Sequence, residues 1–316
     1  MAVMQKPYFS IIIPVYNRAE EIKRAINSCL NQEFSDFEVI VVDDASTDTT
    51  AEIVRKFLDN KIVLLKHTEN QGVCMTRNTG IDSSSGEWLL LLDSDDEFLP
   101  GALQTIFQYA SVCSPEIDRI GFVYQRDDGG ISPNPMPSQT ILDYVGFITW
   151  RTRVTESDFF HCTRRKTFKN VRFSPGRAYE DLYLLDFAAR YKTKMIPDFV
   201  AIIHTDSGNR ASNLSIAERA ASFLRDASDQ HIATNELLSR HGQALCSYAP
   251  CRYRIYQKAR VLYALLSGKK RQGSKLAWQY LREYPFCLQG WIIGVAGMIG
   301  PQFLAKIKAF KIKAQT

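Results

Sequence analysis

The sequence predicts an α/β protein with a mostly parallel central sheet flanked by helices, followed by a helical C-terminal region. Over the first 125 residues, short apolar runs alternate with helix-like segments. These runs are continuous and rich in β-branched residues, which is typical of strands buried on both faces. The last third of the chain has a helical pattern. With 45% hydrophobic and 23% charged residues among 316, the chain has the composition of a globular protein.

The first 125 residues contain five predicted strands and four predicted helices. The strands are short apolar runs at Phe9–Val15, Phe37–Val42, Ile62–Lys66, Glu87–Leu92 and Ile120–Tyr124. The helix-like segments between them are Ala19–Leu30, Thr49–Leu58, Val73–Ser83 and Gly101–Ala110.

The segment from 126 to 213 is mixed. Phe159–Phe168 and Lys194–His204 are predicted strands. Tyr179–Tyr191 is predicted to be a helix, and the acids near its start suit the helix dipole. Residues 214–316 are then predicted to form a separate helical region.

Four of the predicted strands end in polar clusters. These are P-V-Y-N-R (14–18), D-D-A-S-T-D (43–48), T-E-N-Q-G-V (68–73) and D-S-D-D (93–96). Ligands of such sheets bind outside the carboxyl ends of the strands, so four polar ends on one rim predict a site. Three carboxylates within four positions repel one another unless a positive group lies among them. The last cluster is therefore either a solvated strand exit or a metal site.

The charge of the chain is uneven. The net charge is +5, yet the residues from Cys251 onward hold 13 Lys and Arg and one acid, Glu283, for a charge of +12. Segment 303–313, F-L-A-K-I-K-A-F-K-I-K, places apolar residues on one helical face with lysines around them. This is the pattern of a basic helix at a membrane surface, and the clean apolar face favours lipid over nucleic acid. Residues 284–305 carry no charge, but glycines and prolines interrupt them too often for a spanning helix.

The ordered motifs F-S-I-I-I-P-V-Y-N-R, F-E-V-I-V-V-D-D-A-S-T-D, N-Q-G-V-C-M-T-R-N-T-G-I and L-L-L-L-D-S-D-D resemble those of family 2 glycosyltransferases of the bacterial surface-polysaccharide type. The resemblance covers residues 8–125 closely and 159–213 more loosely. It implies the Rossmann-like GT-A fold. Residues 1–213 are then the catalytic domain, with a nucleotide-sugar-binding half (1–125) and an acceptor half (126–213).

The resemblance assigns the metal to the end of the fourth strand. Asp93 and Asp95 match the two acids of an Asp-x-Asp motif that holds Mn²⁺ or Mg²⁺, with Asp95 the first choice as ligand, and Ser94 between them is assigned to the donor. Asp96 follows where another acid can help. His204 is a further candidate ligand, with a structural histidine as the alternative.

The remaining donor contacts also follow from the resemblance. Asp44 matches an acid that accepts a hydrogen bond from the base or its neighbour, and Arg77 matches a basic residue near the nucleotide, with a surface helix residue as the alternative. Arg210 is expected to meet phosphate oxygens from a loop near His204. The loop expected to line the base consists of Pro14, Val15, Tyr16 and Asn17.

Inverting transfer requires a carboxylate that takes the proton of the acceptor hydroxyl. In similar enzymes it comes from an acidic pair that opens a helix, and Glu180-Asp181 fits that place. The family pattern makes Asp181 the base and Glu180 the residue that orients it or the acceptor. The alternative is an ordinary acidic first turn of a helix.

These features predict an inverting, metal-dependent glycosyltransferase that uses a nucleotide-sugar donor, with a UDP-sugar as the first choice. The expected acceptor is a hydroxyl of a glycan or a lipid-linked oligosaccharide in cell-surface polysaccharide synthesis. The expected location is the cytoplasm, at the inner face of the membrane through the basic tail, with no nucleic-acid partner. The alternatives are a nucleotidyltransferase and a non-catalytic GT-A-fold protein that binds glycan or membrane.

Overall fold

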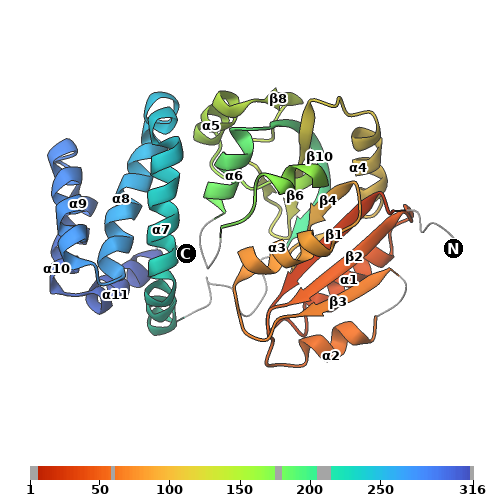
Figure 1. Cartoon of the computed structure of the whole chain (residues 1–316), viewed down its shortest axis with the longest axis horizontal. Coiled ribbons are helices and arrows are strands. Elements are labelled where there is room, and N and C mark those ends of the chain that lie inside the picture. The colour runs from red at the N-terminus through yellow and green to blue at the C-terminus, as the bar shows by residue number, and fades with distance from the viewer. Residues whose placement is uncertain (1–5, 58–60, 175–179, 205–214, 314–316) are drawn as a thin grey trace. The chain divides into compact units, whose positions relative to one another are not determined.

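The computed structural model of the chain describes residues 6–57, 61–174, 180–204 and 215–313 (Figure 1). The chain divides into two compact units. The sheet unit comprises Met1–Phe173 and Tyr183–Ser207, and the helical unit comprises Ser174–Leu182 and Gly208–Thr316.

The first four long strands of the sheet unit form a parallel layer. β1 (Phe9–Val15), β2 (Phe37–Asp43), β3 (Ile62–Lys66) and β4 (Trp88–Leu91) lie in the order β3-β2-β1-β4. β1 pairs in parallel with both β2 and β4, and β2 pairs in parallel with β3. The four predicted strands are therefore confirmed, and their carboxyl ends lie at one edge of the sheet.

The rest of the sheet is mixed. β9 (Phe160–Arg164) runs antiparallel between β4 and β6 (Ile117–Arg126), and β10 (Lys192–Ile203) runs parallel to β6. Short strands complete the sheet: β5 (Glu97–Phe98) and β8 (Thr140–Leu142) pair with β10, and β7 (Ile131–Ser132) pairs with β6.

The prediction of one strand over Phe159–Phe168 is wrong in its second half. The strand β9 stops at Arg164, and the chain continues as a 3₁₀ helix, η1 (Arg165–Lys169). The hydroxyl of Thr167 donates a hydrogen bond of 2.8 Å to the carbonyl of Arg164 and closes this turn. Phe168 is buried in the turn, so its apolar side chain extended the strand-like pattern of the sequence.

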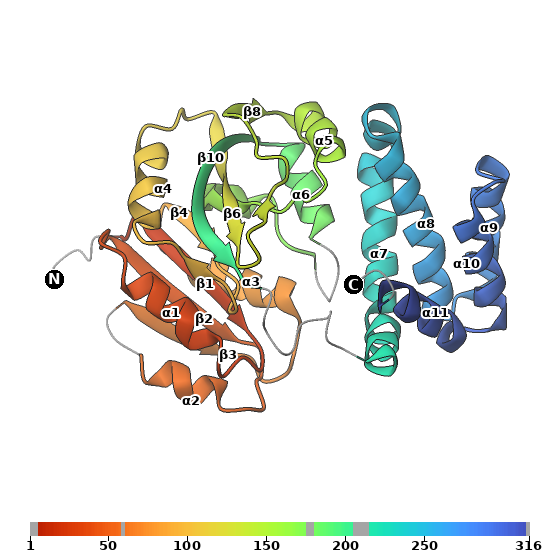
Figure 2. The same cartoon turned by 180° about the vertical axis from the view of Figure 1, so that it is seen from behind.

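Helices cover both faces of the sheet (Figures 1 and 2). On one face, α1 (Ile22–Leu30), α2 (Thr50–Arg55) and α4 (Ala102–Ser111) pack into one apolar core with residues of β1 and β2. On the other face, α3 (Val73–Ser83) lies so close to β1 that a Cβ at Gly80 would come within 2.4 Å of Cγ2 of Ile12. A glycine is thus needed at this crossing.

Two further helices lie between residues 126 and 213. α5 (Tyr144–Arg153) begins at Asp143, whose side chain accepts a hydrogen bond of 2.8 Å from the backbone N–H of Gly146. Such an N-cap satisfies a donor that the first helical turn leaves without a partner. α6 (Asp181–Ala188) confirms the helix predicted here, and its first two residues belong to the helical unit.

The helical unit contains the long helices of the last third of the chain. They are α7 (Ile216–Tyr248), α8 (Pro250–Leu266), α9 (Lys270–Glu283), α10 (Leu288–Ile299) and α11 (Pro301–Lys313). A capping box starts α7, because Ser215 and Glu218 satisfy each other's backbone N–H groups. In the described part of the chain, we find no helix with the length and apolar character needed to cross a membrane.

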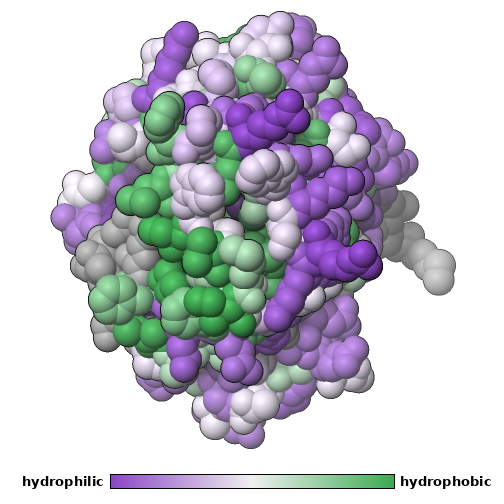
Figure 3. Space-filling view, turned by 90° about the vertical axis from the view of Figure 1, so that its left-hand side faces the viewer, coloured by the Kyte–Doolittle hydropathy of each residue, from purple (hydrophilic) through white to green (hydrophobic). Residues whose placement is uncertain are grey.

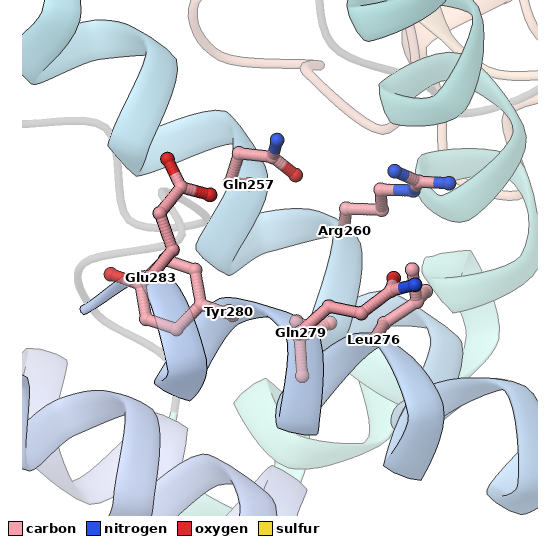
Figure 4. A pocket seen from close by; sticks show the side chains of 7 residues that line it. Gln257, Arg260, Leu276, Gln279, Tyr280 and Glu283 are labelled. Atoms are coloured by element: carbon pink, nitrogen blue, oxygen red, sulfur yellow. The ribbon is translucent and has the colours of Figure 1, made fainter. Parts of the chain in front are cut away.

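A small pocket lies between α8 and α9 within the helical unit (Figure 4). Its volume is about 180 Å³, and polar side chains such as Gln257, Arg260 and Glu283 line much of it. Pockets that enclose small-molecule ligands usually measure roughly 300–1,000 Å³. This pocket is smaller than that range, and the polar strand ends at the rim of the sheet remain the candidate site.

Candidate functional site

The loop after β1 is fastened to the loop after β2. The backbone N–H of Asn17 donates to the hydroxyl of Ser46 at 2.9 Å, and the amide oxygen of Asn17 accepts from the backbone N–H of Thr47 at 2.8 Å. Asn17 adopts a positive φ of 51°, and Ala45 adopts one of 61°. Such backbone conformations are uncommon outside glycine and mark a tightly constrained turn.

The predicted base-binding loop thus has an inner and an outer part. Pro14 and Val15 are the last two residues of β1 and are buried, whereas the ring of Tyr16 is exposed. Tyr16 is therefore the side chain of this loop that offers an accessible ring to a nucleotide base.

Asp44 is buried at the end of β2 and fastens the loop that leads into α3. Its Oδ1 accepts hydrogen bonds from Nδ1 of His67 at 2.7 Å and from the backbone N–H of Gln71 at 2.9 Å, and its Oδ2 accepts from the backbone N–H of Gly72 at 2.8 Å. The Nε2 atom of His67 lies 2.9 Å from the hydroxyl of Thr79. The carboxylate of Asp44 thus holds in place the loop between β3 and α3 at the rim of the sheet.

Asp43 has a different role from its neighbour. Its Oδ1 accepts a hydrogen bond of 2.9 Å from the backbone N–H of Ser46, and its Oδ2 lies 3.5 Å from Nζ of Lys66. Because Asp43 closes the turn after β2, it holds Ser46 in place to receive the hydrogen bond from Asn17.

The acidic end of β4 is surrounded by arginines. Nη2 of Arg77 donates a hydrogen bond of 2.8 Å to Oδ1 of Asp93, and Nη2 of Arg18 lies 3.8 Å from Oδ2 of Asp95. Arg24 donates a hydrogen bond of 2.6 Å to the backbone carbonyl of Asp95. These positive groups offset the mutual repulsion of the carboxylates.

The exposure of the acids decreases from Asp93 to Asp96. The side chain of Asp93 is 47% exposed and that of Asp95 is 17% exposed, whereas Asp96 and Ser94 are buried. Burial, followed by the negative charges of Asp96 and Asp93, raises the pKa of Tyr124 well above its usual value. The tyrosine hydroxyl beside the acids therefore stays protonated.

His204 lies directly after β10. Its ring contacts carboxylates other than Asp93 and Asp95, the acids predicted to hold the metal. Its Nε2 lies 2.8 Å from Oε1 of Glu97, and its Nδ1 lies 3.7 Å from Oδ2 of Asp127. Its backbone N–H donates to Oδ1 of Asp96 at 3.2 Å. The structure thus ties the backbone of His204 to the acidic end of β4 and turns its ring towards Glu97.

The oxygen-rich end of β4 fits a hard divalent cation. Among the residues that the structure describes, no three His, Cys, Asp or Glu side chains are arranged to hold a metal ion by themselves. Mg²⁺ commonly uses one or two carboxylates and takes its other ligands from substrate phosphates and water, and Mn²⁺ prefers similar oxygen ligands. Asp93 and Asp95 match this kind of partial ligand set.

Asp181 is the first residue of α6, and its Oδ2 accepts a hydrogen bond of 2.8 Å from the hydroxyl of Tyr256 in α8. Both residues belong to the helical unit, and Glu180 precedes Asp181 in a turn. No pattern in the sequence points to Tyr256, because it is one of 14 tyrosines and lies far along the chain. Arg210 lies outside the described residues.

The chain matches the model of glycosyl transferase family 2 over residues 10–171, just over half its length. A curated relative is the GalNAc(5)-diNAcBac-PP-undecaprenol beta-1,3-glucosyltransferase of Campylobacter jejuni, 42% identical over 108 residues. That alignment covers 33% of this chain and 35% of the relative, so the chain spans about a third of that protein.

Solved structures share the fold over most of the chain. The crystal structure of S. aureus TarS 1-349 in complex with UDP-GlcNAc has a TM-score of 0.61 at 18% identity, covering 97% of this chain and 92% of that one. The mannosyltransferase PcManGT from Pyrobaculum calidifontis, in complex with GDP-Man and Mn²⁺, has a TM-score of 0.51 at 16% identity, covering 97% and 88%. These structures show the fold, and the match to the family model over more than half of the chain shows that the chain belongs to glycosyl transferase family 2.

Proposed function

We propose that this protein is an inverting, metal-dependent glycosyltransferase. It transfers a sugar from a UDP-sugar to a hydroxyl of a glycan or lipid-linked oligosaccharide in cell-surface polysaccharide synthesis. The observation that carries the proposal is the end of β4, where Asp93 and Asp95 lie beside Arg77 and Arg18 on the rim formed by four parallel strands.

The donor binds at this rim. The exposed ring of Tyr16 stacks on the base, and the loops held by Asn17 and Asp44 form the wall around the nucleoside. Mn²⁺ or Mg²⁺, when bound to Asp93 and Asp95, supplies Lewis-acid stabilisation of the departing diphosphate. A UDP-sugar is the first choice because TarS binds UDP-GlcNAc, and PcManGT, with GDP-Man and Mn²⁺, supports the metal.

Three basic or polar groups serve the diphosphate in this proposal. Arg77 donates a hydrogen bond to Asp93 at the rim and brings a positive charge there. Arg210, which lies outside the described residues, supplies a second positive charge. Ser94 follows Asp93 and offers its hydroxyl to the donor sugar or phosphate. These groups act by electrostatic stabilisation of charge that develops as the bond to the sugar breaks.

The acceptor side depends on the start of α6. Asp181 takes the proton from the acceptor hydroxyl as its oxygen forms a bond to the anomeric carbon, while the bond to the diphosphate breaks on the opposite side. Tyr256 holds Asp181 in one orientation through its hydrogen bond, and Glu180 orients the acceptor. The nucleoside diphosphate leaves with the electron pair of the broken bond.

The proposed class of acceptor rests on the name of a relative and on the positive charge of the C-terminal region. The Campylobacter jejuni relative is named for an undecaprenol-linked acceptor, which favours a lipid-linked oligosaccharide at the cytoplasmic membrane. The excess of positive charge after Cys251 suits anionic lipid headgroups, so we place the protein at the inner face of that membrane through its C-terminal region.

A panel of UDP- and GDP-sugars, assayed for nucleotide release with Mn²⁺ and with a chelator, tests the proposed activity. We expect release from one UDP-sugar, abolished by the chelator. Asp181→Asn should retain donor binding, measured by thermal shift, and lose transfer to an acceptor. Binding without turnover by the wild-type protein would favour the non-catalytic alternative.

A further inference from the structure

Helix α10 presents its large apolar side chains outward and its small residues inward. Gly290, Ala296 and Gly297 are buried against the rest of the helical unit. The exposed residues of the helix include Leu288, Trp291, Ile292, Val295, Met298 and Ile299. A helix on a water-exposed surface normally has the opposite arrangement.

The inward glycines are required by close packing. A Cβ at Gly290 would lie 2.8 Å from the ring of Tyr280 in α9, and a Cβ at Gly297 would lie 2.4 Å from Cδ1 of Leu265 in α8. Any larger side chain at these two positions collides with its neighbours. The orientation of α10 is therefore fixed, and its large side chains remain on the outside.

The exposed residues form part of a larger apolar surface. Leu288 is 72% exposed, Met298 is 62% exposed and Phe286, just before the helix, is fully exposed. Figure 3 shows a hydrophobic area on the face of the molecule to which α10 belongs, bordered by hydrophilic residues. Exposed apolar patches of this kind mark sites of interaction with proteins or membranes.

The ring of Trp291 can enter an apolar environment without losing a hydrogen bond. Its indole N–H donates a hydrogen bond of 2.9 Å to the backbone carbonyl of Pro285. The one polar group of the ring is therefore satisfied within the protein, and moving the ring into lipid leaves no donor without a partner.

Basic residues lie near the apolar segment. Residues 284–305 carry no charge; the exposed Arg282 and Glu283 precede them with opposite charges, and the exposed Lys306 follows them. Lys258 donates a hydrogen bond of 2.5 Å to Oε1 of Gln289, which places a third positive group beside α10. Positive charge around an apolar face is complementary to an anionic lipid surface, because the apolar side chains enter the acyl region and the cations meet phosphates.

Helix α11, which the sequence favoured as the lipid-binding segment, buries one side of its surface inside the protein. Leu304, Ala305 and Ala309 are buried in the core of the helical unit. Nζ of Lys308 donates a hydrogen bond of 3.0 Å to the hydroxyl of Tyr263, and burial lowers the pKa of this lysine to about 8. Phe303 and Phe310 remain exposed on α11.

We propose that the outward face of α10, together with Phe286, lies in the interface of an anionic membrane. At 1.5 Å per residue, the 12 residues of α10 span roughly 18 Å, less than the hydrocarbon thickness of about 30 Å. The helix therefore lies along the membrane surface. This inference deepens the membrane location in the proposed function and rests on it.

Vesicle flotation of the full chain tests the proposal with three double variants. Ile292→Gln/Val295→Gln alters the outward face of α10, and Phe303→Gln/Phe310→Gln alters α11. Ile232→Gln/Ile255→Gln replaces two apolar residues that are equally exposed on α7 and α8 and serves as the matched control. All six side chains are exposed, so folding should persist, as checked by circular dichroism.

With vesicles of phosphatidylcholine and phosphatidylglycerol, we expect the wild type and the control to float together with the lipid. The α10 variant should bind about tenfold more weakly, since affinity scales with the apolar area buried. Vesicles of phosphatidylcholine alone should bind the wild type more weakly, and the tryptophan emission, to which Trp291 contributes, should shift to shorter wavelength less with them than with the anionic vesicles.

Several results would overturn the proposal. They are a wild type that does not float, an α10 variant that floats like the control, and loss of binding confined to the α11 variant. A wild-type dimer that the α10 variant turns into a monomer, without vesicle binding, would assign the patch to a second copy of this chain. Nucleotide release measured on the same samples separates these failures from a failure of the proposed activity.

Discussion

The guanidinium of Arg77 and the carboxylate of Asp93 are joined by a hydrogen bond of 2.8 Å between α3 and the end of β4. Arg77 is buried and also lies over the ring of Phe173, 5.5 Å from its centroid, whereas Asp93 is half exposed. The pair therefore connects the interior of the sheet unit to its rim. It places a positive charge next to the predicted metal ligands.

Replacing Arg77 should weaken both folding and donor binding. Arg77→Ala removes buried packing and the partner of Asp93, and we expect the free energy of unfolding to fall by about 1–3 kcal/mol. A double-mutant cycle with Asp93→Asn, followed by urea unfolding, should give a coupling of about 1 kcal/mol, because Asp93 is partly solvated. A coupling of zero would mean that the contact contributes nothing to stability.

Asp95→Asn should abolish metal-dependent turnover. The substitution removes a charged oxygen ligand while keeping the shape of the side chain, so nucleotide release should fall by about 100-fold or more. Isothermal titration of Mn²⁺ in the presence of UDP measures the same loss as binding. Asp36→Asn, at an exposed aspartate before β2, is the control and should leave both quantities unchanged. Equal turnover by the two variants would contradict the assignment of Asp95.

Tyr256→Phe tests whether the helical unit positions the proposed base. The variant removes the hydrogen bond to Asp181, and we expect kcat to fall by about tenfold with the KM for the UDP-sugar unchanged. Tyr253→Phe removes a hydroxyl from the same helix, one that accepts a hydrogen bond from Gln257, and should leave kcat intact. The proposal fails if both variants behave alike.

His161 should make the stability of the protein depend on pH. Burial and then the charges of Arg119, Arg77 and Arg151 lower its pKa well below 6.5 in the folded protein. The folded state therefore keeps the ring neutral, while the unfolded state gains a proton below pH 6.5. The free energy of unfolding should fall as the pH drops below 6.5, by up to about 1.4 kcal/mol per pH unit from this group.

The His161→Phe variant isolates this contribution. Phenylalanine preserves the stacking on Phe159, whose ring centroid lies 4.3 Å away, and cannot titrate. Urea midpoints between pH 5 and 7.5 should show a shallower pH dependence for the variant than for the wild type. Parallel curves for the two proteins would show that the pKa of His161 is the same in the folded and unfolded states.

The part of the fold that the sequence predicts best is the layer of β1 to β4. β1, β2 and β4 are short, mostly apolar runs such as Phe9–Val15 and are buried on both faces, whereas β3 is an edge strand that is only partly buried. The two- and three-residue strands, such as Glu97–Phe98, are too short to show a period. The antiparallel position of β9 was also not predictable, because it depends on pairing with β4 and β6.

The sequence shows which residues follow the strands and lie at the rim, but it does not show which of them contact one another. Asp93 and Asp95 stand out because they follow an apolar run directly. Arg18 and His67 also lie at strand ends, which is a usable signal, but their contacts with Asp95 and Asp44 join distant segments of the chain. Only the folded chain shows that arginines, as well as any metal, compensate the acidic cluster.

The hydrogen bonds of Asp44 have a consequence for the cost of capturing a substrate. Because His67, Gln71 and Gly72 are already held by this carboxylate, the segment between β3 and α3 has given up much of its conformational freedom during folding. Little ordering entropy then remains to oppose association at this edge. The segment between β3 and α3 is preorganised, and its backbone should hardly shift when the proposed donor binds.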